Sequence, residues 1–381
     1  MDSTTNFRGG SVSVRLPRID LPHTEWMGSL SLSEWKNWNQ PRIDISIITN
    51  NRPLSFTRLF KSLNETHFYG DTVDLRINVE QSADDETLKI VQNVHWPHGT
   101  VFLHHRIVQG GLMQAVVESW YPGSNDTYGL LLEDDVELSP LFYAWAKMSL
   151  LRYRYGDPRN RSPLMFGISL YQQKNVELPP EGRHLFNARA LFNNHGISDP
   201  TTPYLSPIPC SWGAIYFPEH WREFHAYLPL RLSGSPFKLD KTIVPNVRSN
   251  KWTKSWKKYF IELVYLRGYV MLYPNYADFV SLSTNHLEVG SHVKVRTLEK
   301  QKQFLVPLME TTNCGTVALL DLPGRTLPQW NALPVLNLTG GMATLESLVE
   351  VGHIRREELT GCTDDLALFD IHQLLCTAPK L

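Results

Sequence analysis

The sequence has little that would mark a secreted, membrane-spanning or nucleic-acid-binding protein. Its 381 residues include only four cysteines, at no metal-binding or disulfide spacing, which favours a reduced compartment. It has no apolar run of about 18 residues that could span a bilayer, and no apolar signal core at its N-terminus. The net charge of −1 gives no reason to expect nucleic acid as a partner. We therefore expect a cytoplasmic protein with no integral membrane span and no nucleic-acid partner.

Three catalytic signatures are also missing. The sequence contains no Gly-x-x-x-x-Gly-Lys phosphate loop, no Gly-x-Ser-x-Gly nucleophile elbow and no His-Glu-x-x-His zinc motif. These absences argue against a metal-dependent phosphoryl-transfer or hydrolytic enzyme. The length still allows an ample core, in one large domain or two medium-sized ones.

The chain does contain an acidic segment directly after a short apolar run. The leucines at 130–132 have the length of a buried strand, and Glu133, Asp134 and Asp135 follow at its carboxyl end. Ionised carboxylates at such a place are costly unless something pairs with them, and a hard divalent cation is the natural partner. A solvated acidic turn is the alternative. We favour the cation site because the acids follow the leucines without a break.

Strands and helices alternate up to this segment. β-Branched and apolar runs predict strands at 43–49, 73–79, 101–104 and 130–132, with a helix after each of the first three. Ser139-Pro140 predicts the start of a helix after the acids. This alternation predicts an α/β fold, with a mainly parallel sheet flanked by helices. In such sheets ligands bind at the carboxyl edge of the strands, where the acids would lie.

The two ends of the chain carry fewer structural signals than the central part. The polar N-terminal stretch carries Ser31-Leu-Ser-Glu34, which predicts a capping box and a short helix. We expect residues 1–40 to form an arm laid on the main domain. Residues 296–381 are expected to form a C-terminal extension packed on it.

The order of these features resembles a GT-A glycosyltransferase. An Asn-Arg-Pro turn follows the first strand, an Asp-Asp helix start follows the second, and Glu-Asp-Asp follows the fourth. The sequence is similar to family 2-like enzymes and to N-acetylglucosaminyltransferase I over about residues 41–290. Phrases at 255–258, 266–275 and 283–288 also resemble glycosyltransferase-like proteins of fungi and plants. The resemblance implies a Rossmann-like GT-A catalytic domain at 41–295.

The resemblance also implies a substrate and residues that bind it. The donor would be a nucleoside-diphosphate sugar and the acceptor a hydroxyl group on a small molecule, lipid or glycan. Asn50 and Arg52 would face the base, and Asp84 would reach the base or the ribose. Members of the family usually bind the diphosphate through Mn²⁺ or Mg²⁺.

The acids and a late histidine would complete the donor site. Glu133 and Asp134 would contact the nucleotide-sugar, with Asp134 against the ribose, while Asp135 would bind the cation. Asp134 and Asp135 are thus the first candidates for catalytic groups. His286, in a polar loop at 281–290 that suits a mobile lid, would join the metal shell. A surface or structural role for His286 is equally compatible with the sequence.

On the acceptor side, the sequence matches the family's loop but lacks its usual acidic base. Trp212 and Gly213 match the family's acceptor-side loop, although Trp212 could equally be a core residue. Inverting members usually carry an acidic base where this sequence has Lys254, so Asp240 and Glu262 are the remaining, weak candidates.

The missing base leaves two alternatives open. A retaining enzyme needs no such carboxylate, and a non-catalytic relative could bind nucleotide or sugar without turning it over. Lys254, Lys257 and Lys258 could hold the diphosphate, but a solvated basic face is the preferred interpretation.

Overall fold

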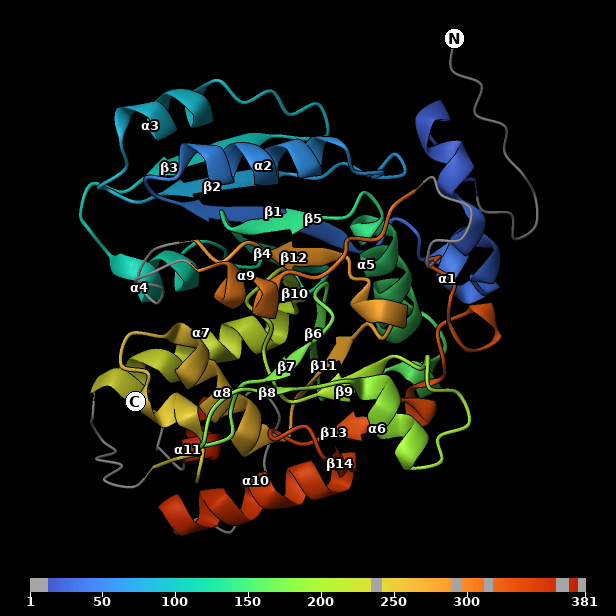
Figure 1. The fold of residues 1–381 in the computed structure, drawn as a ribbon, viewed down its shortest axis with the longest axis vertical. Helices are drawn as coiled ribbons and strands as arrows, with labels where there is room; N and C mark the ends of the chain where they lie inside the picture. The colour runs from blue at the N-terminus through green and yellow to red at the C-terminus, as the bar shows by residue number, and fades with distance from the viewer. Residues whose placement is uncertain (1–12, 234–241, 289–296, 312–317, 361–369, 376–381) are drawn as a thin grey trace.

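The structure is a computed structural model that describes residues 13–233, 242–288, 297–311, 318–360 and 370–375. At its centre lies a ten-stranded sheet with the order β14-β13-β9-β11-β6-β10-β4-β1-β2-β3 (Figure 1). Its strands, in chain order, are β1 (Arg42–Thr49), β2 (Leu75–Val79), β3 (Val101–His105), β4 (Thr127–Glu133), β6 (Met165–Ser169), β9 (Tyr204–Ser206), β10 (Ala214–Tyr216), β11 (Val270–Tyr273), β13 (Val335–Leu336) and β14 (Met342–Ala343). Two small sheets accompany it, formed by β5 (Val136–Leu138) with β12 (Ser283–Asn285) and by β7 (Asn175–Val176) with β8 (His184–Leu185).

Helices flank this sheet, so the predicted α/β class is confirmed. The α-helices are α1 (Leu32–Lys36), α2 (Pro53–Asn64), α3 (Asp85–Gln92), α4 (Gly111–Val117), α5 (Phe142–Leu150), α6 (Ala188–Asn194), α7 (Pro218–Ser233), α8 (Trp256–Arg267), α9 (Leu298–Phe304), α10 (Leu345–Thr360) and α11 (Ile371–Leu375). One turn of π-helix (Leu151–Tyr155) continues α5. Short 3-10 turns lie at Arg18–His23, Glu25–Ser29, Pro158–Asn160, Arg248–Lys251, Ala277–Phe279, Pro323–Arg325 and Trp330–Ala332.

The first four strands lie side by side and run in the same direction. β1 pairs in parallel with β2 and β4, and β2 pairs in parallel with β3. Their carboxyl ends therefore meet at one edge, which carries the loops after Thr49, Val79 and Glu133. Beyond β4 the sheet is mixed, because β10 enters antiparallel between β4 and β6.

The segment after the acids differs from the prediction. Residues 136–138 form β5, which pairs antiparallel with β12 from the late polar loop. The helix then begins at Phe142 with Leu141 at its N-cap, so the predicted start at Ser139-Pro140 is wrong. Ser139 instead donates to the Met309 carbonyl at 2.6 Å. Pairing with β12 keeps this stretch extended and delays the first helical turn.

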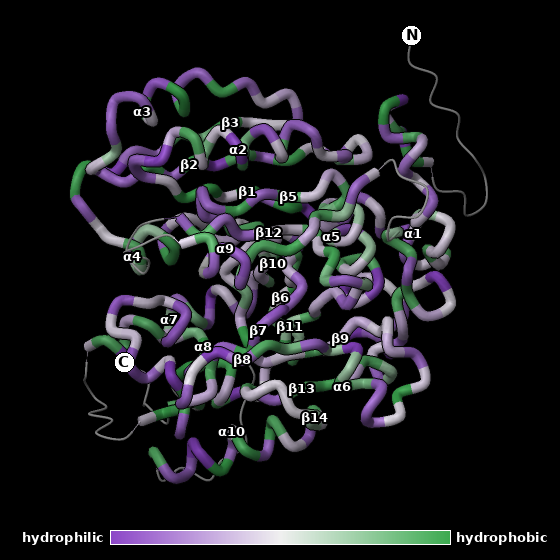
Figure 2. The backbone as a smooth tube through the Cα atoms, viewed as in Figure 1, coloured by the Kyte–Doolittle hydropathy of each residue, from purple (hydrophilic) through white to green (hydrophobic). Residues whose placement is uncertain are grey.

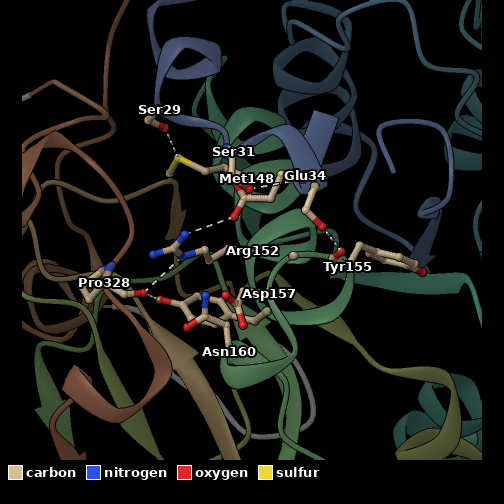
Figure 3. A network of polar contacts seen from close by, with 12 residues as sticks. Ser29, Ser31, Glu34, Met148, Arg152, Tyr155, Asp157, Asn160 and Pro328 are labelled. Carbon is tan, nitrogen blue, oxygen red and sulfur yellow. Dashed lines mark hydrogen bonds and ion pairs between the residues drawn. The ribbon is translucent and has the colours of Figure 1, made fainter. Parts of the chain in front are cut away.

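The N-terminal arm is fastened by a polar network at α1 (Figure 3). The predicted capping box is confirmed, because Ser31 accepts from the Glu34 N–H while the Glu34 carboxylate accepts from the Ser31 N–H. Arg152, in the π-helical turn that follows α5, contacts Glu34 at 3.3 Å and donates to the Pro328 carbonyl at 3.4 Å. The arm, α5 and a C-terminal segment thus share one junction.

C-terminal residues also extend the sheet. β13 pairs with β9 and β14 pairs with β13, while α10 lies along α8 at the lower edge of the view in Figure 1. Apolar side chains form a core on each face of the sheet. Figure 2 shows that the outer loop around α3 is mostly hydrophilic. In the described part of the chain, no helix has the length and apolar character needed to cross a membrane.

Candidate functional site

The three acids lie at the carboxyl end of β4, next to the end of β1. Ile48 pairs with Glu133, so the turn that carries Thr49 and Arg52 stands directly beside the acids. The fold reaches this arrangement because both strands are buried, apolar and parallel. Residues 80 positions apart in the sequence thereby come to one edge of the sheet.

The protein itself occupies both carboxylate oxygens of Asp134. Arg52 Nη1 donates to Asp134 Oδ1 at 2.7 Å, and Thr49 Oγ1 donates to Oδ2 at 2.8 Å. Asp134 is only 3 % exposed, so this pair is a buried ion pair with a supporting hydrogen bond. Asp134 therefore fixes the turn after β1.

Asp135 is held differently. Its Oδ1 is buried and has no hydrogen-bond partner among the described residues, while its side chain accepts a hydrogen bond from Asn285. Burial, together with the Asp134 charge, raises the pKa of Asp135 to about 6. A buried oxygen with an unused lone pair is unusual in native proteins and marks a place where a ligand can bind.

Glu133 lies between Asp134, Asp135 and the basic side chains of Arg52 and Lys257. Burial, reinforced by the two aspartates, raises the pKa of Glu133 to about 8. Like charges at one strand end cannot all remain ionised without compensation. A bound cation would supply it.

The late loop brings His286 to the same edge. The His286 N–H donates to the Asp135 carbonyl at 2.9 Å, and its ring Nε2 lies 2.6 Å from Glu137 Oε2. Glu288, which sequence reasoning did not single out, pairs with Arg58 at 3.2 Å and contributes to the raised pKa of Asp135. Within the segment at 281–290 that was expected to be a mobile lid, Ser283 to Asn285 form the strand β12, and His286 follows it directly. Residues 289–290 lie outside the described residues.

The nucleoside-side candidates lie on two neighbouring loops of this edge. Asn50 Oδ1 accepts from Ser82 Oγ at 3.2 Å, which joins the loop after β1 to the loop after β2. Asp84 is the N-cap of α3 and accepts from the Thr87 N–H at 2.7 Å, and these Thr87 hydrogen bonds hold the pKa of Asp84 below its usual value. The helix start predicted at the Asp-Asp pair after the second strand is therefore confirmed, with Asp84 as the N-cap.

Glu80 is a residue of this edge that sequence reasoning missed. Its carboxylate accepts from the N–H groups of Gly110, at 3.2 Å, and Gly111, at 2.9 Å. Burial would raise the pKa of Glu80, but the backbone N–H of Gln81, together with those of the two glycines, outweighs burial and lowers the pKa. Its position directly after the second strand was the only signal in the sequence. Glu80 fixes the loop after β3 to the loop after β2.

On the acceptor side, Gly213 has a structural reason to be glycine. Its φ is +91°, and a Cβ placed there would lie 3.1 Å from Ser283 Cβ. Ser283 Oγ also donates to the Trp212 carbonyl at 2.6 Å, so this loop rests on β12. The Trp212 ring is half-buried and makes edge-to-face contacts with the rings of Tyr171 and Phe304. The centroid distances are 4.8 and 5.1 Å.

The lysines expected on one helix separate into different environments. Lys254 is exposed and precedes α8, whereas Lys257 is buried in its first turn and donates to Glu177. Lys257 Nζ also lies 5.9 Å from the centroid of the Trp212 ring. The residue of this group that the structure brings near the acids is therefore Lys257.

Of the two candidates for a base, Glu262 is the one that the structure describes. Glu262 is buried in α8, where it accepts from Tyr227 at 2.9 Å and from Arg231 at 2.8 Å. Asp240 lies outside the described residues. Neither carboxylate is therefore placed beside the acidic edge in the part of the chain that the structure describes.

The fit of a divalent cation depends on Asp135. Within the described ranges, no three His, Cys, Asp or Glu side chains are grouped as a ready metal site. Asp134 is committed to Arg52 and Thr49, and the His286 ring nitrogen Nε2 to Glu137. The buried, unpartnered Asp135 Oδ1 fits a cation that takes one protein oxygen and its other ligands from a diphosphate and water.

Comparisons with known proteins give a partial match in sequence. A family model described as the SPBC1E8.03c C-terminal domain matches residues 52–169, which include α2 and the acidic segment. No curated protein matches the sequence.

Solved structures match over more of the chain, at low identity. TarS 1-349 from S. aureus is 13% identical, with a TM-score of 0.38 over 61% of this chain and 58% of its own. The mannosyltransferase PcManGT from Pyrobaculum calidifontis, in complex with GDP-Man and Mn²⁺, is 14% identical, with a TM-score of 0.35 over 67% of this chain and 64% of its own. In both, the chain spans less than two thirds of the matched structure's length.

Proposed function

We propose that this chain transfers a glycosyl group from a nucleoside-diphosphate sugar to a hydroxyl-bearing acceptor, with Mn²⁺ or Mg²⁺ bound at Asp135. The observation that carries the proposal is the difference between two neighbouring acids. Each oxygen of Asp134 already accepts a hydrogen bond, from Arg52 or from Thr49, whereas Asp135 keeps a buried oxygen without a partner among the described residues. A site built only for stability would pair both acids.

The proposed roles follow from the positions of the side chains. Asn50 and Asp84, on neighbouring loops of the same edge, would contact the nucleoside, and Arg52 would hold Asp134 against the ribose. Asp135 would bind the cation, with His286 at its side. When bound, the cation stabilises the charge that develops on the departing nucleoside diphosphate.

The acceptor would approach from the side of Trp212 and Gly213. The close packing of Gly213 on Ser283 supports this direction of approach, because Ser283 belongs to β12 and β12 pairs with β5, the strand that directly follows the acids. Proton removal from the acceptor hydroxyl needs a base in an inverting enzyme, and Asp240 remains a candidate by sequence alone. Glu262 is a poorer candidate because Tyr227 and Arg231 occupy its carboxylate. A retaining route, which needs no such carboxylate, stays open.

A screen of nucleotides tests the proposal and separates it from binding without turnover. UDP, GDP and their sugars should raise the melting temperature of the full chain in the presence of Mn²⁺ and much less in its absence. Release of free nucleoside diphosphate from a stabilising nucleotide-sugar would identify an enzyme. Stabilisation without such release would identify a non-catalytic binding protein. Absence of any Mn²⁺-dependent stabilisation would refute the donor site.

A further inference from the structure

A cluster of three basic side chains surrounds one carboxylate beside the acceptor-side loop. Lys257 donates to Glu177, and Arg183 Nη2 lies 3.9 Å from Glu177 Oε2. Arg248 Nη1 lies 3.4 Å from the backbone carbonyl of Glu177, and its charge also acts on that carboxylate. The side chains of Glu177 and Lys257 are each 10% exposed, and that of Arg183 is 36% exposed. Three positive charges thus face one negative charge, at a place where Glu177 and Lys257 are buried and Arg183 is exposed to solvent.

Arg183 is the basic group with the least compensation. The 3.9 Å separation from Glu177 is too long for a hydrogen bond, and Arg183 has no hydrogen-bond acceptor among the described residues. Its guanidinium carbon lies 4.7 Å from the centroid of the Phe304 ring, which holds the planar group in place. Burial lowers the pKa of Arg183, and the charge of Arg248 lowers it further. A positioned guanidinium with uncommitted donors is suited to bind an oxyanion through two parallel hydrogen bonds.

The cluster adjoins the acidic edge without being part of it. Arg183, Glu177, Trp212 and Lys257 line one small cavity of about 20 Å³, which has room for about one water, so an oxyanion would meet Arg183 from the solvent side, where its side chain is 36% exposed. Lys257 acts on the Glu133 carboxyl electrostatically, and Trp212 is tied to β12 through Ser283. An anion bound here would therefore lie on the acceptor side, apart from a diphosphate held at Asp135.

We propose that Arg183, Arg248 and Lys257 bind an oxyanion, a phosphate or a carboxylate, that the acceptor substrate carries. Assigning the anion to the acceptor rests on the proposed function, whereas the oxyanion site itself rests only on the cluster. Glu177 neutralises one of the three positive charges, that of Lys257, so a net positive charge remains for the anion. An acceptor of this chemistry would be a phosphorylated or acidic glycan, or a phospholipid headgroup.

Inorganic phosphate is a direct probe of the site. Isothermal titration of phosphate into the full chain, saturated with UDP or GDP and Mg²⁺, should show binding that remains when the donor site is filled. Arg183→Gln and Arg248→Gln should each weaken it roughly tenfold, as expected for loss of a charge-assisted hydrogen bond. Arg159→Gln is the matched control, since Arg159 is 79% exposed and pairs with Asp157 on the surface. Glu177→Gln should tighten phosphate binding by removing the one opposing charge.

Further arms identify the source and guard against misfolding. Glucose 6-phosphate and glucuronate should compete with phosphate for the site, and glucose should not. Binding to vesicles that contain phosphatidic acid, compared with vesicles of phosphatidylcholine alone, tests whether the anion is a lipid headgroup. Arg183→Lys keeps the charge but loses the fork, and should bind more weakly than the unmodified chain and more tightly than Arg183→Gln. Melting curves of each variant show whether the fold is kept.

The outcomes separate this inference from the proposed function. Phosphate affinity that is unchanged in both Arg183→Gln and Arg248→Gln, or phosphate binding that nucleotide abolishes, overturns it. Phosphate binding that depends on these arginines in a chain that binds no nucleotide would leave the oxyanion site standing and refute the glycosyl-transfer proposal. Nucleotide binding without phosphate binding would do the reverse.

Discussion

Arg52 Nη1 donates to Asp134 Oδ1 at 2.7 Å across the ends of two parallel strands. Because Arg52 already neutralises Asp134, that carboxylate is a poorer ligand for a cation. Asp135 is the neighbouring acid with an unpartnered oxygen. Two adjacent residues of the same chemical type therefore have different roles. The predictions below depend on that difference.

The first prediction concerns the cation. Asp135→Asn keeps the shape of the side chain and removes its charge, so we expect loss of Mn²⁺-dependent nucleotide binding, by roughly tenfold or more, with the fold intact. In the unmodified chain the cation competes with a proton on a group of pKa about 6. Cation binding should therefore strengthen as the pH rises through about 6. Titration of Mn²⁺ and nucleotide at several pH values measures both effects, and unchanged metal dependence in Asp135→Asn would contradict the assignment.

The second prediction concerns stability. Arg52→Gln leaves the buried Asp134 carboxylate without its charged partner and should lower the free energy of unfolding by about 3 kcal/mol. Arg42→Gln is the control, because Arg42 is 59% exposed and lies 3.4 Å from Asp74. It should cost less than about 1 kcal/mol. Denaturant unfolding compares the two, and equal losses would show that the Arg52 contact is not special.

The third prediction is a pH dependence of stability. The pKa of Glu133 is raised from 4.5 to about 8 in the folded state, so the folded chain keeps a proton that the unfolded chain loses. Stability should therefore fall as the pH rises from about 4.5 to about 8. Glu133→Gln should remove the part of that fall above about pH 6, where Asp135 is already ionised, and be more stable than the unmodified chain at pH 8, by at least about 1 kcal/mol after allowance for solvent screening.

Melting temperatures measured across this pH range, without added cation, test the Glu133 assignment. Glu65→Gln is a suitable control because Glu65 is 57% exposed and lies 3.8 Å from Lys61. Its melting curve should follow that of the unmodified chain at every pH. A parallel curve for Glu133→Gln would mean that this carboxyl titrates normally.

The fourth prediction concerns His286. If its ring contacts the cation mainly in the donor complex, His286→Ala should slow turnover of the nucleotide-sugar far more than it weakens binding of metal alone. Glu137→Gln removes the group that now holds Nε2 and should change metal binding in the opposite direction, because it releases the ring. Single-turnover rates and direct metal titration provide the comparison. Equal effects on both measurements would return His286 to a structural role.

Much of the fold was readable from local pattern. Apolar runs at 43–49 and 130–132 predict the strands β1 and β4, and the Pro53 turn with Phe56, Leu59 and Leu63 at helical spacing predicts α2. The place of Glu133, Asp134 and Asp135 at a strand end follows from the same reasoning. These features depend on neighbours a few residues away, which the sequence displays directly.

Contacts between distant segments were decided only by the tertiary structure. Nothing near Val136 indicates that it becomes a strand, because its partner β12 lies about 150 residues later. The unequal states of Asp134 and Asp135 depend on Arg52, and the basic cluster depends on Glu177 meeting Lys257 across 80 residues. Side-chain spacing specifies the face of an element, whereas pairing of charges and edges depends on how elements pack. The sequence therefore determined where the acids stand, and packing determined which of them is left to bind.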